Sequence, residues 1–95
     1  MKIIGVDKLD EAKTKYPIVR KQIDVWRDLV EEADWETPYN LKTQFGSADL
    51  LGNKLVVFNI KGNHFRLLVK IDYQFQLVII KKFGTHKEYD TWKLK

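Results

Sequence analysis

The chain has 95 residues, of which 44% are hydrophobic and 32% charged, and its formal net charge is +4 at pH 7. This length and composition fit one packed α+β domain over residues 1–95 rather than a disordered tail. The chain has no cysteine, which excludes disulfides and thiolate chemistry. It also has no export signal and no apolar run of about 20 residues that could cross a bilayer. We therefore expect a cytoplasmic protein without membrane contacts.

Charge is distributed unevenly between the two halves of the chain. Residues 1–50 contain eight Lys/Arg and ten Asp/Glu, a net charge of −2, whereas residues 51–95 contain nine and three, a net charge of +6. A basic face attracts phosphate groups, and the release of counterions adds to the affinity. Charge alone leaves two interpretations open, which are a polyanionic partner such as RNA and simple solubility.

The start of the chain predicts a short strand followed by two helices. Residues 1–6 are rich in isoleucine and valine, and Asp7 is then expected to cap a helix that ends before Pro17. A second helix is predicted over residues 17–33, where apolar residues recur at helical spacing. Its apolar stripe consists of Val19, Ile23, Trp26, Val30 and Ala33.

Thr37 and Pro38 predict the start of a short third helix that points Leu41 and Phe45 inward. Residues 46–49 predict a turn. From there on the helical spacing of apolar residues gives way to strand-like runs.

Three runs of β-branched and aromatic residues cover residues 55–60, 65–71 and 75–81. The short gaps between them are typical of hairpins, so we expect an antiparallel meander. Helices followed by a meander predict a two-layer α+β fold, in which the amino-terminal helices pack on an antiparallel sheet of three strands plus the short first strand.

The middle strand should present two different faces, because side chains alternate along a strand. One face is apolar and should pack on the helices, and the other is semi-polar and positive. The apolar face holds Phe65, Leu67, Val69 and Ile71, and the other face holds His64, Arg66, Leu68 and Lys70.

The residues from Thr85 to Glu88 have the S/T-x-x-E form of a capping box, which predicts a short last helix from His86. That helix adds polar groups to the rim of the positive face. The candidate functional residues on this face are Asn59, Lys61, Asn63, His64, Arg66, Lys81, Lys82, His86 and Tyr89. The sequence has no zinc-ligand spacing, phosphate-binding glycine loop or serine-hydrolase motif, so we expect neither metal nor cofactor.

Such a set of residues suits metal-free cleavage of RNA. That reaction needs a base for the 2′-OH, cations for the charge on the phosphorane and an acid for the leaving 5′ oxygen. Each residue also has a structural alternative: Arg66 either binds phosphate or pairs with Asp72 or Glu88, and His86 either reacts or caps a helix. Tyr89 either reacts or closes the core. The tryptophans are better explained by packing, although Trp92 could also stack on a base.

Two segments resemble the HigB family of toxins from type II toxin–antitoxin systems. They are Phe58-Asn-Ile-Lys-Gly-Asn-His-Phe-Arg66 and Gly84-Thr-His-Lys-Glu-Tyr-Asp90. Residues 25–35 and 41–45 are also similar to that family, so the resemblance covers nearly the whole chain in order.

The resemblance implies a RelE-like fold and a ribosome-dependent mRNA interferase that cuts mRNA in the ribosomal A site without metal. It also implies inhibition by a HigA-type antitoxin with a helix-turn-helix domain. The complex would bind operator DNA only through that antitoxin. The resemblance does not specify the codon preference, the stoichiometry of the complex, or which residue is the general base and which the general acid. The alternatives from other classes are a non-catalytic RNA-binding module on the same basic face and a protein that only docks an acidic partner.

Carried over to this chain, the family's motifs imply a role for eight residues. Arg66 would stabilise the phosphate, and Lys81 takes a position that is often arginine in relatives, which weakens bidentate phosphate recognition there. The residues with an implied catalytic role are Arg66, Lys81, His86 and Tyr89. The residues expected to bind substrate are Lys61, Asn63, His64 and Lys82; for Lys61 and His64 the alternative is a solvated surface residue without a role.

Overall fold

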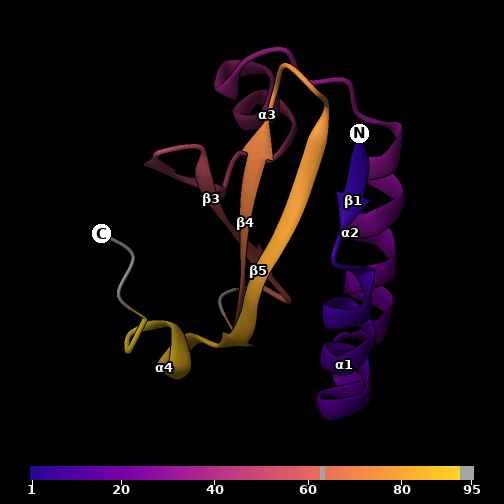
Figure 1. The fold of residues 1–95 in the computed structure, drawn as a ribbon. Coiled ribbons are helices and arrows are strands. Elements are labelled where there is room, and N and C mark those ends of the chain that lie inside the picture. The colour runs from indigo at the N-terminus through magenta and orange to yellow at the C-terminus, as the bar shows by residue number, and fades with distance from the viewer. Residues whose placement is uncertain (63, 93–95) are drawn as a thin grey trace.

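A computed structural model describes residues 1–62 and 64–92. Within these residues, five strands, four α-helices and one short 3-10 helix follow one another (Figure 1). In order they are β1 (Lys2–Ile4), α1 (Val6–Lys15), the 3-10 helix (Pro17–Val19), α2 (Arg20–Glu32), α3 (Pro38–Gln44), β2 (Asp49–Gly52), β3 (Leu55–Ile60), β4 (Phe65–Asp72), β5 (Leu77–Thr85) and α4 (His86–Tyr89).

The strands form one open sheet in the order β1-β5-β4-β3-β2. β1 pairs parallel to β5, and the other neighbours are antiparallel. In Figure 1, α1 and α2 lie together on one side of the sheet, and α4 lies beyond the end of β5. The predicted α+β architecture, with amino-terminal helices on a mainly antiparallel sheet and a three-stranded meander, is confirmed.

The sequence prediction was wrong in two details of the sheet. It did not include β2, because the residues around Gly52 are typical of turns and all four residues of that edge strand are exposed. It also placed the last strand at residues 75–81, whereas β5 covers Leu77–Thr85. Phe75 lies in the β4–β5 turn with 67% of its surface exposed. Both errors arise because a local apolar pattern does not reveal where strand pairing begins and ends.

Gly5, and not Asp7, is the N-cap of α1. Its backbone adopts a φ of 93°, a left-handed conformation that glycine accepts without steric cost. A Cβ at this position would also lie 3.3 Å from the Cβ of Ile80 on β5. The chain therefore turns sharply from β1 into α1 against β5, and Asp7 falls within the first helical turn instead.

The core lies between the helices and one face of the sheet. The apolar stripe of α2 is buried there, with Ile23 and Val30 fully covered. Phe58 of β3 is the centre of an aromatic cluster, with ring centroids 5.3 Å from Trp26 and 5.0 Å from Phe45. Trp35 stacks against the same ring at 6.5 Å. The predicted packing role of Trp26 and Trp35 is confirmed.

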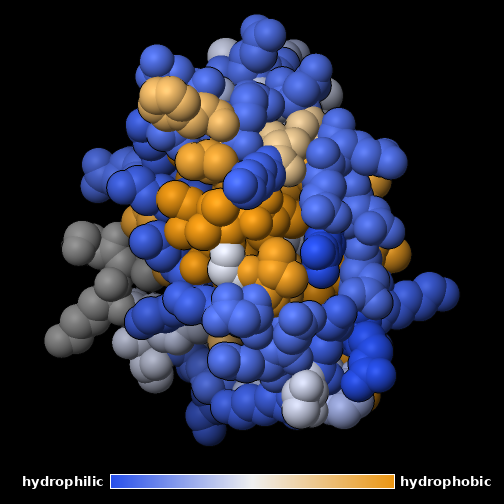
Figure 2. Space-filling model, turned by 45° about the vertical axis from the view of Figure 1, so that its right-hand side comes forward, coloured by the Kyte–Doolittle hydropathy of each residue, from blue (hydrophilic) through white to orange (hydrophobic). Residues whose placement is uncertain are grey.

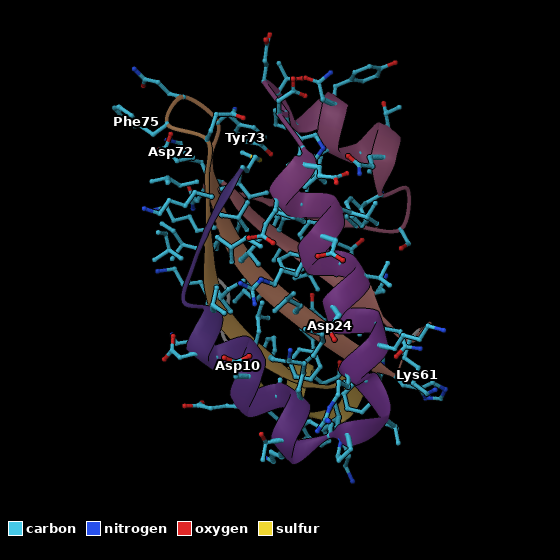
Figure 3. The ribbon with its side chains drawn as sticks, turned by 90° about the vertical axis from the view of Figure 1, so that its right-hand side faces the viewer. Asp10, Asp24, Lys61, Asp72, Tyr73 and Phe75 are labelled. Atoms are coloured by element: carbon cyan, nitrogen blue, oxygen red, sulfur yellow. The ribbon has the colours of Figure 1, made fainter. Side chains whose placement is uncertain are left out.

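Lys13 joins α1 to α2. Its Nζ lies 2.8 Å from the Oδ1 of Asp24 on α2 and 3.6 Å from that of Asp10 on its own helix (Figure 3). These surface pairs connect the two helices but contribute little to stability. Within residues 1–62 and 64–92, no helix is long and apolar enough to cross a membrane.

The opposite face of the sheet is less polar than the sequence predicted. Val57 and Leu68 lie on it and are buried, outside the cluster that packs on the helices. Ile4 and Ile79, which pair across β1 and β5, share this face and are partly exposed. Figure 2 shows hydrophobic side chains gathered in the middle of the surface, with hydrophilic ones around them. On this face Arg66 and Lys82 lie toward the end of the sheet near α4, and Lys70 lies farther along β4.

Candidate functional site

Arg66 is the centre of a cluster on the face of the sheet away from the helices. It lies between Asn59 of β3 and Gly84 of β5 and is only 7% exposed. One guanidinium nitrogen, Nη2, lies 2.8 Å from Nδ1 of His86. The guanidinium carbon lies 5.5 Å from the centre of the Tyr89 ring. The structure thus brings together three of the four residues expected to be catalytic.

The hydrogen bond between Arg66 and His86 determines the protonation pattern of the histidine. A guanidinium can only donate, so Nδ1 of His86 accepts and the neutral ring carries its proton on Nε2. Nε2 points toward Asp90, whose Oδ2 is 3.9 Å away. Asp72 and Glu88 were the two carboxylates expected to pair with Arg66 if its role were only structural. Asp72 instead accepts a hydrogen bond from the backbone N–H of Phe75. Glu88 accepts from the Tyr16 hydroxyl and the Thr85 backbone.

The short helix α4 is held in place by the capping box that the sequence predicted. The Thr85 hydroxyl accepts from the Glu88 backbone, and the Glu88 carboxylate accepts from the Thr85 backbone at 3.0 Å. Tyr16, at the end of α1, donates its hydroxyl to the same carboxylate at 2.8 Å. The backbone N–H of Thr85 and then the Tyr16 hydroxyl lower the pKa of Glu88 below its ordinary value. His86 also donates its backbone N–H to the carbonyl of His64.

Gly84 allows α4 and the following residues to approach β5 closely. A Cβ at this position would lie 3.0 Å from the ring of Trp92 and 3.2 Å from the Cβ of Glu88. Gly84 was not among the residues predicted to be functional. A lone glycine inside a strand was nevertheless a usable signal, because it often marks close approach of other atoms.

Trp92 lies beside this cluster, whereas the sequence predicted a packing role for it in preference to base stacking. Its ring centroid lies 5.5 Å from that of Tyr89 in an edge-on arrangement. On its other side, Nζ of Lys82 lies 5.7 Å from the Trp92 ring. Cations and rings therefore follow one another in the row Arg66–Tyr89–Trp92–Lys82, with a cation at each end.

Lys81 and Lys82 lie at a β-bulge, where the register between β4 and β5 shifts at Leu68 and Val69. Both are exposed, and both line a hollow of about 310 Å³ between β5 and α1. Lys82 contacts the Trp92 ring, which in turn contacts Tyr89 of the Arg66 cluster. Lys81 lines the same hollow as Lys82. Lys81, the fourth residue expected to be catalytic, is therefore placed with the hollow rather than with His86 and Tyr89.

Lys61 of the β3–β4 turn lies apart from the Arg66 cluster, whereas His64 adjoins α4. Lys61 has a left-handed φ of 52° and lines a second hollow of about 400 Å³, against α2. Figure 3 shows Lys61 at the end of the molecule opposite Tyr73 and Phe75. The side chain of His64 is exposed, and its backbone carbonyl contacts α4. Asn63, also expected to bind substrate, lies outside the described residues.

Comparison with known proteins identifies the family. The model of the HigB toxins, described as the RelE-like toxic component of a toxin–antitoxin system, matches residues 19–92. The chain belongs to this family. The protein named mRNA interferase toxin HigB from Escherichia coli K12 is 30% identical to it over 92 residues, which cover 95% of this chain and 88% of that protein. Proteins named mRNA interferase HigB from Escherichia coli O157:H7 and Shigella flexneri match to the same extent.

Membership in the HigB family implies an antitoxin as a partner of this toxin. The region that matches the family model starts at Val19, after α1, and ends at Trp92. It contains the Arg66 cluster and Trp92, whereas the α1 lysines that line the smaller hollow precede it.

Proposed function

We propose that this HigB-family toxin is an endoribonuclease that cleaves mRNA on the ribosome by attack of a 2′-OH on the adjacent phosphodiester, without a metal ion. The observation that carries the proposal is the contact of buried Arg66 with His86 and Tyr89. The names of the curated relatives, which are called mRNA interferases, support the same activity.

Arg66 supplies the positive charge that this reaction requires. Its guanidinium remains protonated at any physiological pH and can grip a phosphate with two parallel hydrogen bonds. Because Arg66 is 7% exposed, the surrounding protein weakens screening by water and strengthens its attraction for charge that develops on the phosphorane. Lys82, at the other end of the row, adds a second cation through Trp92.

His86 is proposed as the base. In the free protein its Nδ1 lone pair accepts from Arg66, so a phosphate that attracts the guanidinium exposes that lone pair to the 2′-OH. The 2′ oxygen then bonds to phosphorus while its proton moves to Nδ1. The bond from phosphorus to the 5′ oxygen breaks, and that oxygen takes a proton from an acid, for which the Tyr89 hydroxyl is proposed. The products are a 2′,3′-cyclic phosphate and a free 5′-OH.

The proposed inhibitor is a HigA-type antitoxin with a helix-turn-helix domain, which alone carries the complex to operator DNA in the cytoplasm. The helical side of the toxin is the proposed docking surface. Val25 and Leu29 of α2 are 50% and 39% exposed and line the hollow of about 400 Å³ that Lys61 also lines. Val25→Asp with Leu29→Asp should abolish neutralisation by the antitoxin but leave toxicity intact. Retained neutralisation would exclude this surface.

Expression from a tightly controlled promoter tests the nuclease proposal. The unmodified chain should arrest bacterial growth and yield new mRNA ends with 2′,3′-cyclic phosphates. Arg66→Ala combined with Tyr89→Phe should do neither. Lys54→Gln, which removes a charge at the β2–β3 turn, serves as the control and should behave like the unmodified chain.

Three outcomes would contradict parts of the proposal. If the unmodified chain binds RNA without creating new ends, it is a non-catalytic RNA-binding module. Cleavage of free RNA at the rate seen on ribosomes would remove the dependence on ribosomes. New ends that carry a 3′-OH and a 5′ phosphate, the products of attack by water, would contradict the metal-free attack of a 2′-OH.

A further inference from the structure

We propose that the hollow between α1 and β5 is a second RNA-binding subsite, which holds the backbone of the substrate strand next to Arg66 while Trp92 stacks on a base. The inference rests on the proposed function, because it takes RNA as the ligand. The hollow has a volume of about 310 Å³ and is lined by residues of both elements and by Trp92. Four of these residues are lysines, namely Lys8, Lys15, Lys81 and Lys82.

The charge of the hollow favours an anion. All four lysines are exposed, and Glu11 is the one carboxylate that lines the hollow with them in the described part of the chain. Cations gathered around one concave surface repel one another, and a bound polyanion relieves that repulsion and releases its own counterions. The β-bulge contributes to the arrangement, since it lets the adjacent Lys81 and Lys82 both line the hollow.

The aromatic row connects the hollow to the proposed reaction centre. Tyr89 lies beside Arg66, and Trp92 lies between Tyr89 and Lys82. Surfaces that bind single-stranded nucleic acid combine a positive groove with rings on which successive bases stack. Trp92 is partly exposed at this position in the row.

An extended strand fits this surface better than an isolated phosphate ion. A strand whose reacting phosphate contacts Arg66 would continue along Tyr89 and Trp92 and bring its next phosphates to the lysines. An isolated phosphate would need only the lysines and would not use the rings. Trp92 therefore distinguishes the two kinds of ligand.

Binding of a short single-stranded 2′-O-methyl RNA to the full-length chain tests the subsite, because this probe lacks the nucleophile and is not cut. Lys8→Gln with Lys15→Gln should weaken binding and reduce the slope of log affinity against log salt by about 0.7 for each phosphate that the variant no longer neutralises. The control, Lys2→Gln with Lys54→Gln, removes the same charge at exposed positions outside the hollow and should bind like the unmodified chain.

Two further variants separate charge from stacking. Trp92→Leu should weaken binding roughly five-fold to a hundred-fold with an unchanged salt slope, since stacking releases no counterions. Glu11→Gln should tighten binding, because it removes the negative charge from the hollow. An unchanged affinity in both would contradict the subsite.

Cleavage measured in parallel separates this inference from the proposed nuclease activity. If the unmodified chain cuts mRNA but the Lys8/Lys15 variant binds RNA like its control, the subsite is wrong and the nuclease proposal is unaffected. If the lysines and Trp92 matter for binding but no RNA is cut, the nuclease proposal fails and the subsite is supported. A defect seen only in co-sedimentation with ribosomes would assign the hollow to ribosomal RNA and overturn its role for the substrate strand.

Discussion

The side chains of β4 alternate between two faces of the sheet, and the two faces contact different parts of the protein. Leu67 and Val69 point to the helices and are fully buried in the common core. Arg66 points to the other side, where it contacts His86 and Tyr89 of α4. One face of the strand therefore contributes mainly to stability, and the other presents the groups of the candidate site.

This separation has a physical cause. Apolar burial is the main favourable contribution to folding, and the helical side supplies most of it here. The opposite side can then hold a buried guanidinium at one end of the sheet without disrupting the core. Substitutions on the helical face should therefore lower mainly the free energy of unfolding, and substitutions on the opposite face should lower mainly the cleavage activity.

The largest change in stability is expected for Leu67→Ala. Removing a fully buried leucine side chain leaves a cavity in the helical side of the sheet, at a cost of about 2–5 kcal/mol. Chemical denaturation should show this loss. Activity per folded molecule should be retained below the transition, and a specific loss of activity in the folded protein would contradict the separation of the two faces.

Arg66→Met should have the opposite profile. It keeps a side chain of similar length but leaves Nδ1 of His86 without its donor, so a loss of stability of about 1–3 kcal/mol is expected, smaller than for Leu67→Ala. Loss of the charge that stabilises the transition state should reduce cleavage roughly 10²- to 10³-fold. Chemical denaturation and a cleavage assay on the same purified protein measure the stability and the activity. Unfolding of the variant would show that Arg66 is mainly structural.

A smaller effect is expected for Gly84→Ala. The new Cβ would lie 3.0 Å from the Trp92 ring, so Trp92 and α4 must shift. Overpacking of this kind costs about 1–3 kcal/mol. Denaturation should detect the loss, and tryptophan fluorescence should report the displaced ring. Gly46→Ala, whose new Cβ would meet no atom within 4 Å, is the matched control and should change neither quantity.

The smallest effect is expected for Glu88→Gln, and it should depend on pH. The pKa of Glu88 is lowered in the folded state, chiefly by the Thr85 backbone N–H and then by Tyr16. Its ionised form therefore stabilises the fold above the ordinary value of 4.5, and this stabilisation is lost as the pH falls through the lowered pKa. Because the carboxylate is exposed, the difference at neutral pH should stay below about 1 kcal/mol.

Denaturation curves of Glu88→Gln and the unmodified chain at several pH values measure this dependence. The two proteins should differ at neutral pH and converge in acid. A constant difference at all pH values would show that the carboxylate acts through packing rather than charge.

The sequence by itself determined most of the elements and the pairing of the central strands. The α2 stripe, the Thr85–Glu88 capping box and the alternation around Arg66 are local patterns with direct structural consequences. Its resemblance to the HigB family, carried by the motifs around Arg66 and His86, is confirmed by the match over residues 19–92.

Only the tertiary structure decided which candidate residues meet. It brought Arg66, His86 and Tyr89 together, added Trp92, and placed Lys81 and Lys82 beside the lysines of α1. A local pattern predicts the direction of a side chain relative to its own element. Contacts between residues distant in sequence depend on strand register, a bulge and the close approach allowed by Gly84, which local spacing does not encode.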